Sequence, residues 1–293
     1  MERSVFLNGE VLPFAEARIP IMDRGFLFAD GVYEVGAVLD GGLVDNAAHL
    51  ARLDRSLAEI AVANPYSALE WRHHQCGLVR RNGLDQGVVY IQVTRGVAER
   101  DFAYPPDLPP TVLMFTQARN LLDSPLARNG AAVVTLPDIR WGRRDIKSIG
   151  LLAQVMAKRG AAEAGAAEAF MVEDGTITEG ASSSVFLVTR DDVIVTRPLS
   201  RALLPGITRL AVMGLAEQHG LALQERAFTV DEACAAAEVF FTSASNFVVP
   251  VVSIDRRPIG TGRPGPRSAE LRELYIAAAR ADARLMAQVR SRE

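Results

Sequence analysis

Apolar positions recur along the chain with two periods, one typical of a helix and one of a strand. In residues 46–61, apolar side chains stand three or four positions apart, which is the spacing of one face of an amphipathic helix. Residues 88–94 and 111–116 are short, almost continuous apolar runs, and such runs predict buried strands. The pattern therefore predicts a mixture of helices and strands around an apolar core.

Turn residues and further apolar runs extend this prediction. Asn8-Gly9 divides residues 5–14 into a hairpin, because this dipeptide accepts the positive φ of a type I′ turn, and Asp40-Gly41-Gly42 divides residues 32–44 in the same way. Further helices are predicted at residues 67–82, 147–164, 206–219 and 269–287, and further strands at residues 131–136, 169–172, 184–188, 193–196, 239–242 and 248–254. In the helix predicted over residues 147–164, the side chains expected to face inward are Ile149, Leu152, Val155 and Met156.

The order of these elements predicts the fold class. Strands and helices are interleaved without a regular strand–helix–strand alternation, which favours an α+β fold in two lobes. The apolar periodicity stops between Asn120 and Pro125 and resumes at Ala131. We therefore predict an N-terminal α/β lobe at residues 1–119, a linker at residues 120–125 and a C-terminal α/β lobe at residues 126–293.

Composition narrows the range of partners. The 293 residues carry a formal net charge of −3, and 49% of them are hydrophobic. A nearly neutral chain has no electrostatic support for binding nucleic acid or anionic lipid. No apolar stretch approaches the roughly 18 residues that span a bilayer, and the first eight residues lack the basic and apolar regions of a signal peptide. We expect a cytoplasmic protein that acts on small molecules and binds neither nucleic acid nor membranes.

Metal chemistry has little support in the sequence. The two cysteines, Cys76 and Cys234, lie far apart and form no Cys-x-x-Cys pair, so we expect both to be reduced. The four histidines show no metal-ligating spacing. The motifs of serine hydrolases, P-loop enzymes and dinucleotide-binding proteins are also missing, so no metal site and none of these activities is predicted.

A shortage of lysine singles out one residue. Of the 32 basic residues, 30 are Arg and only Lys147 and Lys158 are Lys. Arg stays protonated and cannot act as an amine nucleophile, whereas Lys can lose its proton and form an imine. Lys147 is predicted at the start of a helix, where burial and the nearby Arg143 and Arg144 would lower its pKa. A lone lysine near a helix start is also a common solvated side chain.

Two further segments carry groups that complement such an amine. Residues 178–184 place Glu179 among small hydroxyl residues, where the backbone can approach a ligand and the carboxylate can hold a protonated ring nitrogen. Gly206-Ile207-Thr208 opens a predicted helix, and exposed amides with a hydroxyl at a helix N-terminus suit a phosphate. Each segment alone is also explained as a serine-rich turn or an ordinary helix cap. Together, the amine, the carboxylate and the phosphate-binding amides are the groups that pyridoxal 5′-phosphate requires.

With these residues in view, the sequence resembles the class IV (fold type IV) pyridoxal-phosphate aminotransferases, and most of all their D-amino acid transaminase branch. The resemblance runs over residues 5–259. The segments that carry it are Asp23-Arg24-Gly25, Asp30-Gly31-Val32-Tyr33-Glu34-Val35, His49-Leu50-Ala51-Arg52-Leu53, Gln92-Val93-Thr94-Arg95-Gly96, Asp145-Ile146-Lys147-Ser148, Thr178-Glu179-Gly180, Gly206-Ile207-Thr208-Arg209 and Phe241-Thr242-Ser243. The resemblance implies a two-lobed fold with the cofactor between the lobes, the lysine in the C-terminal lobe, and a homodimer.

The resemblance also implies the cofactor site. Lys147 is expected as the Schiff-base lysine and proton shuttle, and Glu179 as the partner of the pyridine nitrogen. The remaining cofactor-binding residues expected are Arg52, Ile207 and Thr208 at the phosphate, Leu204 against the ring, and Ser243 and Ala244 beside them. Ala244 departs from the family, which has a Thr with a further phosphate contact here. Without the resemblance, Arg52 would be read as a surface residue of a helix.

The expected substrate site departs from the family at one position. The resemblance implies that Tyr33 and Arg100, the latter delivered by the neighbouring subunit, hold the substrate carboxylate, with Ser182 and Ser183 also at the substrate. Phe102 stands where the family usually has a histidine. Because an aromatic ring cannot replace a charge-assisted donor, we expect a weaker or differently arranged carboxylate site.

The function implied is a ping-pong transaminase that moves the amino group of a D-amino acid, such as D-alanine, to a 2-oxo acid. Two alternatives within the same fold are a branched-chain L-amino acid aminotransferase and an aminodeoxychorismate lyase. A third, from another class, is a small-ligand-binding protein that has lost its catalytic groups. The presence of both Lys147 and Glu179 argues against this last alternative.

Overall fold

The hairpins predicted near the N-terminus are present in the computed structural model, which describes residues 3–289. β1 (Ser4–Leu7) and β2 (Glu10–Pro13) pair antiparallel, and Asn8 and Gly9 between them have φ values of 50° and 96°. These positive values are the ones that a type I′ turn needs. The second hairpin joins β3 (Gly31–Leu39) to β4 (Gly42–Leu43). Both turns were predictable because local turn chemistry alone decides them.

The described chain divides into two units, of which unit 1 contains a six-stranded sheet in the order β2-β1-β6-β5-β3-β4. β5 (Gly87–Thr94) and β6 (Thr111–Ala118) form its centre with β3, and all three pair antiparallel. The helices of this unit are α1 (Arg24–Phe28), α2 (Asn46–Glu59) and α3 (Ala68–Arg81).

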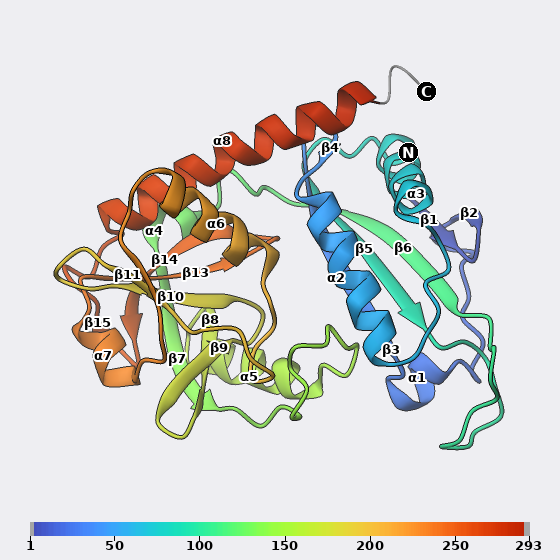
Figure 1. Ribbon diagram of the computed structural model, residues 1–293, viewed down its shortest axis with the longest axis horizontal. Helices are drawn as coiled ribbons and strands as arrows, with labels where there is room; N and C mark the ends of the chain where they lie inside the picture. Colours follow the sequence, from blue (N-terminus) through green and yellow to red (C-terminus); the bar gives the residue numbers. More distant parts are fainter. Residues whose placement is uncertain (1–2, 290–293) are drawn as a thin grey trace. The chain divides into compact units, whose positions relative to one another are not determined.

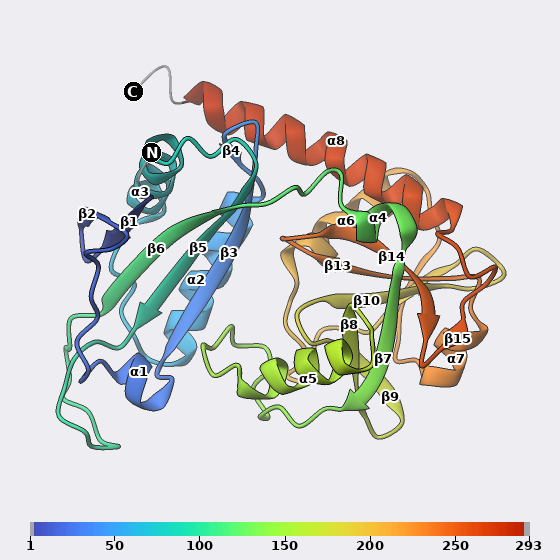
Figure 2. The same cartoon turned by 180° about the vertical axis from the view of Figure 1, so that it is seen from behind.

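The helices α2 and α3 cover one face of this sheet (Figures 1 and 2). Leu53 and Leu57 of α2 and Trp71 of α3 pack with Val89 and Ile91 of β5 in one buried apolar cluster. α3 begins at a capping box, in which Ser67 and Glu70 satisfy each other's backbone amides. The helical period read from the sequence therefore identifies the side chains that α2 buries.

The opposite face of the sheet carries a row of aromatic rings. Tyr33, Tyr90 and Phe115 stand on β3, β5 and β6, and their ring centroids are 5.6 Å and 4.6 Å apart along the row. All three are only half-buried within the described chain. This face of unit 1 is therefore available for further contacts.

Unit 2 is built on a nine-stranded sheet in the order β12-β11-β10-β13-β14-β7-β8-β9, with β15 paired to β14. Its strands are β7 (Ala131–Pro137), β8 (Glu168–Glu173), β9 (Thr176–Gly180), β10 (Ser184–Val188), β11 (Ile194–Thr196), β12 (Leu223–Glu225), β13 (Glu238–Ser243), β14 (Phe247–Ile254) and β15 (Arg257–Pro258). Its helices are α4 (Pro125–Asn129), α5 (Leu152–Glu163), α6 (Ile207–Gln218) and α7 (Val230–Ala235). Helix α8 (Pro266–Val289) has residues in both units.

These elements confirm the predicted α+β class, and most predicted elements match within a few residues. The short elements α1, α4, α7, β9, β12 and β15 were not predicted. None of the helices between residues 3 and 289 combines the length and the apolar character of a membrane-spanning helix.

The helix predicted over residues 147–164 is wrong in its start and in its buried face. α5 begins only at Leu152, and Leu152, Val155 and Met156 are exposed instead of inward. The helix packs through Ala157 and Ala161, which form a small cluster with β8. Small side chains allow close packing of a helix on a sheet, so the larger apolar side chains point away from unit 2.

The division of the chain also differs from the predicted lobes. Unit 1 takes the chain up to Asn120, Ile146–Gly150 and the chain from Ala279 onward, while unit 2 takes Leu121–Asp145 and Leu151–Ala278. The segment with Lys147, predicted within the C-terminal lobe, therefore belongs to unit 1. Residues 1–2 and 290–293 of the predicted lobes lie outside the described residues.

Candidate functional site

The segment that carries Lys147 lies beside β3 of unit 1. The Tyr33 amide donates to the Lys147 carbonyl over 2.9 Å, and the Ile149 amide donates to the Gly31 carbonyl over 3.1 Å. Val32 and Ser148 complete an isolated antiparallel bridge. These backbone contacts hold Lys147 in an extended strand-like segment, and this explains why the predicted helix does not begin there.

The side chain of Lys147 is half-buried and lies over an aromatic ring. Its Nζ is 4.3 Å from the centroid of the Tyr33 ring. Within the described part of unit 1, Nζ has neither a hydrogen bond nor an ion pair. An amine that no carboxylate holds is accessible to an aldehyde, which suits a nucleophile.

Arg143 and Arg144, which were expected to lower the pKa of this lysine, are themselves neutralised. Arg143 pairs with Asp145 over 3.0 Å, and Arg144 pairs with Glu173 over 2.6 Å. The charges of both arginines are therefore directed at carboxylates of their own.

Arg52 is buried, although its helix pattern alone would place it at the surface. Its Nε and Nη2 donate to the two oxygens of Glu34 over 2.7 Å and 2.9 Å, and His49 hydrogen bonds with Glu34 over 2.8 Å. Burial raises the pKa of Glu34, but the Arg52 ion pair and these hydrogen bonds outweigh it and hold the pKa well below its usual value. Glu34 thus fixes the orientation of the Arg52 guanidinium.

A cluster of charged side chains, made of Arg24, Asp30 and Arg95, contacts the loop that carries Arg100 and fixes it. Arg24 donates to Asp30 over 2.9 Å and to the Asp101 carbonyl over 2.6 Å. Arg95 also donates to Asp30, over 2.8 Å. Burial raises the pKa of Asp30, but the hydrogen bonds and charges of Arg95 and Arg24 outweigh this effect, so the pKa of Asp30 is lowered. Arg100 itself is exposed.

Phe102, the residue at the usual histidine position, follows Arg100 in the same loop. Its side chain is 81% exposed and its ring lies 5.6 Å from Phe28. The Arg100 guanidinium lies 5.4 Å from the same Phe28 ring. The loop therefore presents a cation and an apolar ring side by side.

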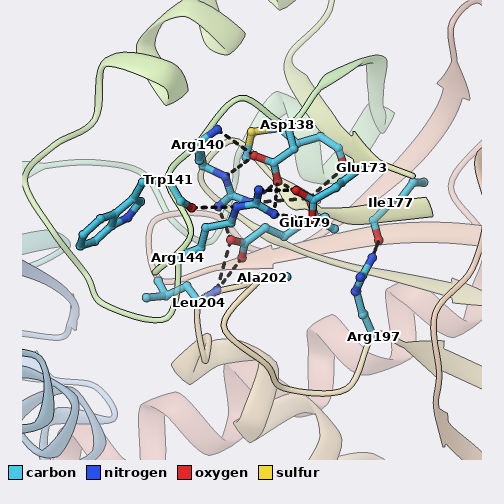
Figure 3. Close-up of polar contacts among 12 residues, drawn as sticks. Asp138, Arg140, Trp141, Arg144, Glu173, Ile177, Glu179, Arg197, Ala202 and Leu204 are labelled. Carbon is cyan, nitrogen blue, oxygen red and sulfur yellow. Dashed lines mark hydrogen bonds and ion pairs between the residues drawn. The ribbon is translucent and has the colours of Figure 1, made fainter. Parts of the chain in front are cut away.

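In unit 2, Glu179 lies on β9 within a buried network of arginines and carboxylates (Figure 3). Arg140 forms an ion pair with Glu179 through Nη1. Its Nε and Nη2 donate to the two oxygens of Asp138 over 2.9 Å and 2.7 Å. Thr178, the neighbour of Glu179 on β9, donates its hydroxyl to Asp138 over 2.6 Å. These contacts fix the position of the Glu179 carboxylate.

The loop before α6 contributes a backbone donor to the same carboxylate. The Leu204 amide lies 3.2 Å from each oxygen of Glu179. Burial raises the pKa of Glu179, and the Arg140 ion pair and the Leu204 amide offset this only in part, so the pKa stays above its usual value. The expected contact of Leu204 with a cofactor ring stays a prediction, but the structure places its backbone on Glu179.

The start of α6 combines free backbone amides with unpaired hydroxyls. Gly206 is the N-cap and provides no side-chain cap for the first amides of the helix. A Cβ on Gly206 would come within 2.5 Å of the Ser184 hydroxyl, so only glycine allows this close approach. The hydroxyls of Thr208 and Thr242 are buried without a hydrogen-bond partner among the described residues. Thr242 pairs with Ser184 across β13 and β10.

This arrangement fits a phosphate group. Unpaired buried hydroxyls cost free energy unless a ligand supplies partners, and amides at a helix N-terminus attract an anion. Ile207 and Thr208 lie at these amides, as expected for phosphate-binding residues. Thr242 was not predicted, although it directly precedes the predicted pair Ser243 and Ala244.

The other predicted residues of unit 2 have different surroundings. Ser182 and Ser183 donate their hydroxyls to the buried Glu168 over 3.3 Å and 3.0 Å. Ser243 accepts a hydrogen bond from the Asn246 side chain over 3.2 Å, and Ala244 lies in the turn after β13. Their expected roles at substrate and cofactor stay predictions.

Sequence reasoning missed the partners that hold the predicted residues. These are Arg140 and Asp138 around Glu179, Glu34 and His49 around Arg52, and the unpaired hydroxyl of Thr242. A charged residue in an apolar strand, as Glu34 is in β3, is the one sequence signal that points to a buried ion pair. No cluster of metal-ligating side chains is found among residues 3–289.

The class of the protein is shown by comparison with known families. Residues 31–254 match the family model described as amino-transferase class IV. The chain belongs to this family.

Relatives of known sequence cover nearly the whole chain. A D-alanine aminotransferase of Bacillus licheniformis is 43% identical over 262 residues, which cover 89% of this chain and 92% of the relative. A D-alanine aminotransferase of Staphylococcus aureus (strain MSSA476) is 40% identical over 272 residues, covering 92% of this chain and 95% of the relative.

Solved structures share the fold. A branched-chain amino acid aminotransferase of Thermoproteus uzoniensis, with norvaline, superposes with a TM-score of 0.84 at 25% identity, covering 96% of this chain and 96% of the other. The branched-chain enzyme of Escherichia coli has a TM-score of 0.88, at 22% identity, covering 97% and 96%. The α+β fold of this chain is therefore that of the class IV aminotransferases.

Proposed function

We propose that the protein is a pyridoxal-phosphate-dependent transaminase that moves the amino group of a D-amino acid, such as D-alanine, to a 2-oxo acid. The observation that carries this proposal is the identity of 43% with a D-alanine aminotransferase over 89% of the chain. The 25% identity with a branched-chain enzyme of the same fold is clearly lower.

The cofactor contributes an aldehyde that takes up an amino group and a ring that accepts electron density. Lys147 is proposed to bind this aldehyde, because its amine has no carboxylate partner in the described part of unit 1. The same amine is proposed to remove the proton from the Cα atom of the donor, as a positioned general base. Glu179 is proposed to hold a proton on the ring nitrogen.

The phosphate is proposed to bind at the start of α6, to the amides of Ile207 and Thr208 and to the Thr208 hydroxyl. Arg52 would add a guanidinium whose direction Glu34 fixes through two hydrogen bonds of 2.7 Å and 2.9 Å. Leu204, Ser243 and Ala244 are proposed around the cofactor, with Ala244 unable to add a hydroxyl contact.

For the substrate, Tyr33 and Arg100 are proposed to hold the α-carboxylate, with Ser182 and Ser183 nearby. Arg100 is proposed to act in the partner subunit of a homodimer. Its exposure and the buried cluster of Arg24, Asp30 and Arg95 below its loop support this role. Phe102 supplies no charge-assisted donor beside Arg100, so carboxylate binding is expected to be weaker than with a histidine there.

The cytoplasm is the proposed location, because both Cys76 and Cys234 are free thiols and a reducing compartment keeps thiols in this form.

A panel of single half-reactions tests the proposed function. The holoenzyme is mixed with one amino acid at a time, and conversion of the cofactor is followed through its absorption spectrum. D-alanine is expected to convert the cofactor much faster than L-alanine or L-leucine. Rapid conversion by L-leucine and none by D-alanine would instead identify a branched-chain L-amino acid aminotransferase, which the similarity to the Thermoproteus uzoniensis structure makes the second candidate.

A further inference from the structure

A buried network of ion pairs surrounds Glu179. It contains two arginines, Arg140 and Arg144, and two carboxylates, Asp138 and Glu179, and none of these four side chains is more than 6% exposed. Glu173, which pairs with Arg144, is 39% exposed. A charge buried in this way is costly unless a partner of opposite charge lies close to it.

The geometry of Arg140 directs its charge at one carboxylate of this network. Asp138 takes up Nε and Nη2 of Arg140 in a two-point contact, and the remaining Nη1 is directed at Glu179 (Figure 3). Asp138 is itself held by the Thr178 hydroxyl over 2.6 Å and lies 3.2 Å from Arg144. The guanidinium is therefore fixed on three sides, and its charge is presented to Glu179.

We propose that Arg140 is a positioning residue that keeps Glu179 ionised, so that the proton shared between Glu179 and the cofactor's ring nitrogen stays on the nitrogen. This inference rests on the proposed function. Arg140 reaches the cofactor only through Glu179.

The contacts of Glu179 bear on where the shared proton sits. Glu179 faces Arg140 and the Leu204 amide, and both stabilise its charged form. Burial and the nearby Asp138 favour the protonated carboxyl, and loss of Arg140 would leave only the Leu204 amide to oppose them. The ring nitrogen would then lose its proton and become a weaker acceptor of electron density.

The test compares Arg140→Gln with Arg140→Lys, which keeps the charge but loses the two-point contact. The first readout uses the apoprotein: the infrared band of a protonated carboxyl, assigned by its loss in an additional Glu179→Gln variant. The second readout is the ¹⁵N chemical shift of the ring nitrogen in holoenzyme made with labelled pyridoxal phosphate.

The expected results differ between the two variants. In Arg140→Gln, the Glu179 carboxyl band is expected to persist to higher pH than in the wild type, and the ¹⁵N shift to move toward the unprotonated value. The turnover number is expected to fall about tenfold or more, with a smaller change in KM. Arg140→Lys is expected to restore the protonated ¹⁵N shift and part of the turnover.

A wild-type ¹⁵N shift and carboxyl band retained in Arg140→Gln would overturn the proposal. If Arg140→Gln does not fold, the ¹⁵N chemical shift of the wild-type holoenzyme tests the proposal. A shift typical of an unprotonated ring nitrogen there would contradict the role of Arg140. A protein that binds no pyridoxal phosphate would contradict the proposed function instead, while the carboxyl band of the apoprotein would still report on Arg140 and Glu179.

Discussion

A buried hydroxyl without a hydrogen-bond partner in the protein indicates that the residue binds a ligand and does not stabilise the fold. Thr208 and Thr242 bury their hydroxyls without a partner among the described residues, whereas the Thr196 hydroxyl donates to the Val185 carbonyl over 2.9 Å. An unsatisfied buried hydroxyl costs about 1–3 kcal/mol. The hydroxyl of Thr242 therefore does not stabilise the fold. It would stabilise a bound phosphate by donating a hydrogen bond to it.

Replacing Thr242 by Val is expected to leave the melting temperature of the apoprotein unchanged or raised. The same change is expected to weaken pyridoxal phosphate binding by about 10- to 150-fold, since a hydrogen bond to a charged group contributes about 1.5–3 kcal/mol. Calorimetry of the apoprotein and titration with the cofactor measure the two effects.

The matched control is Thr196→Val, which removes a hydroxyl with a protein partner. It is expected to lower the melting temperature and to leave the cofactor affinity unchanged. Equal cofactor affinity in Thr242→Val and the wild type would show that this hydroxyl does not contact the phosphate.

At the same scale, the sequence could predict the chemical groups but not their partners. Lys147 is a candidate because lysine is scarce, and Glu179 because small residues surround it, and both roles stay predictions. Arg140 was not a candidate, since its partner Glu179 lies 39 positions away and only the pairing of β9 brings the two together. Long-range contacts between charged side chains leave no periodic signal in a sequence.

Among the elements, α5 shows the limit of periodicity. The spacing of its apolar side chains predicts a helix, and the helix is present, but the pattern does not say what covers each face. The alanines face β8, while Leu152, Val155 and Met156 are 73%, 61% and 55% exposed. Exposed apolar residues clustered on one helix are typical of a protein interface. We expect this face to lie in the interface of the proposed homodimer.

The variant Leu152→Glu/Val155→Glu is expected to shift the protein from dimer to monomer, because it would bury two charges without partners in the interface. Light scattering coupled to size-exclusion chromatography measures the mass. Transaminase activity is expected to fall with the dimer, since Arg100 is proposed to act in the partner subunit.

Leu69→Glu provides the control, because Leu69 is 59% exposed on α3 and also gains one charge. It is expected to leave the mass unchanged. A double variant that stays dimeric, with full activity, would exclude the exposed face of α5 from the interface.

For the whole molecule, the sequence predicted the α+β class, which the structure confirms, while its lobes and linker stay predictions beside the observed division after Asn120. It did not predict that the chain returns to unit 1 at Ile146–Gly150. This return depends on hydrogen bonds between residues far apart in sequence, such as that from Tyr33 to Lys147. The spacing of apolar residues carries no information on hydrogen bonds between distant segments. For this reason, we predicted Lys147 in the C-terminal lobe.

The proposed reaction depends on one amine, and the chain contains its own control. Lys158 is the only other lysine, and its Nζ is engaged in an ion pair with Glu168 over 2.8 Å. Lys147 has no such partner in the described part of unit 1. The two amines should therefore differ in their reaction with an aldehyde.

The most direct measurement is borohydride reduction of the holoenzyme, followed by digestion and mass spectrometry of the peptides. We predict that the phosphopyridoxyl group is found on Lys147 alone, that it is retained in Lys158→Ala, and that it is lost in Lys147→Ala together with transamination. Labelling of Lys158, or a Lys147→Ala variant with unchanged turnover, would contradict the account.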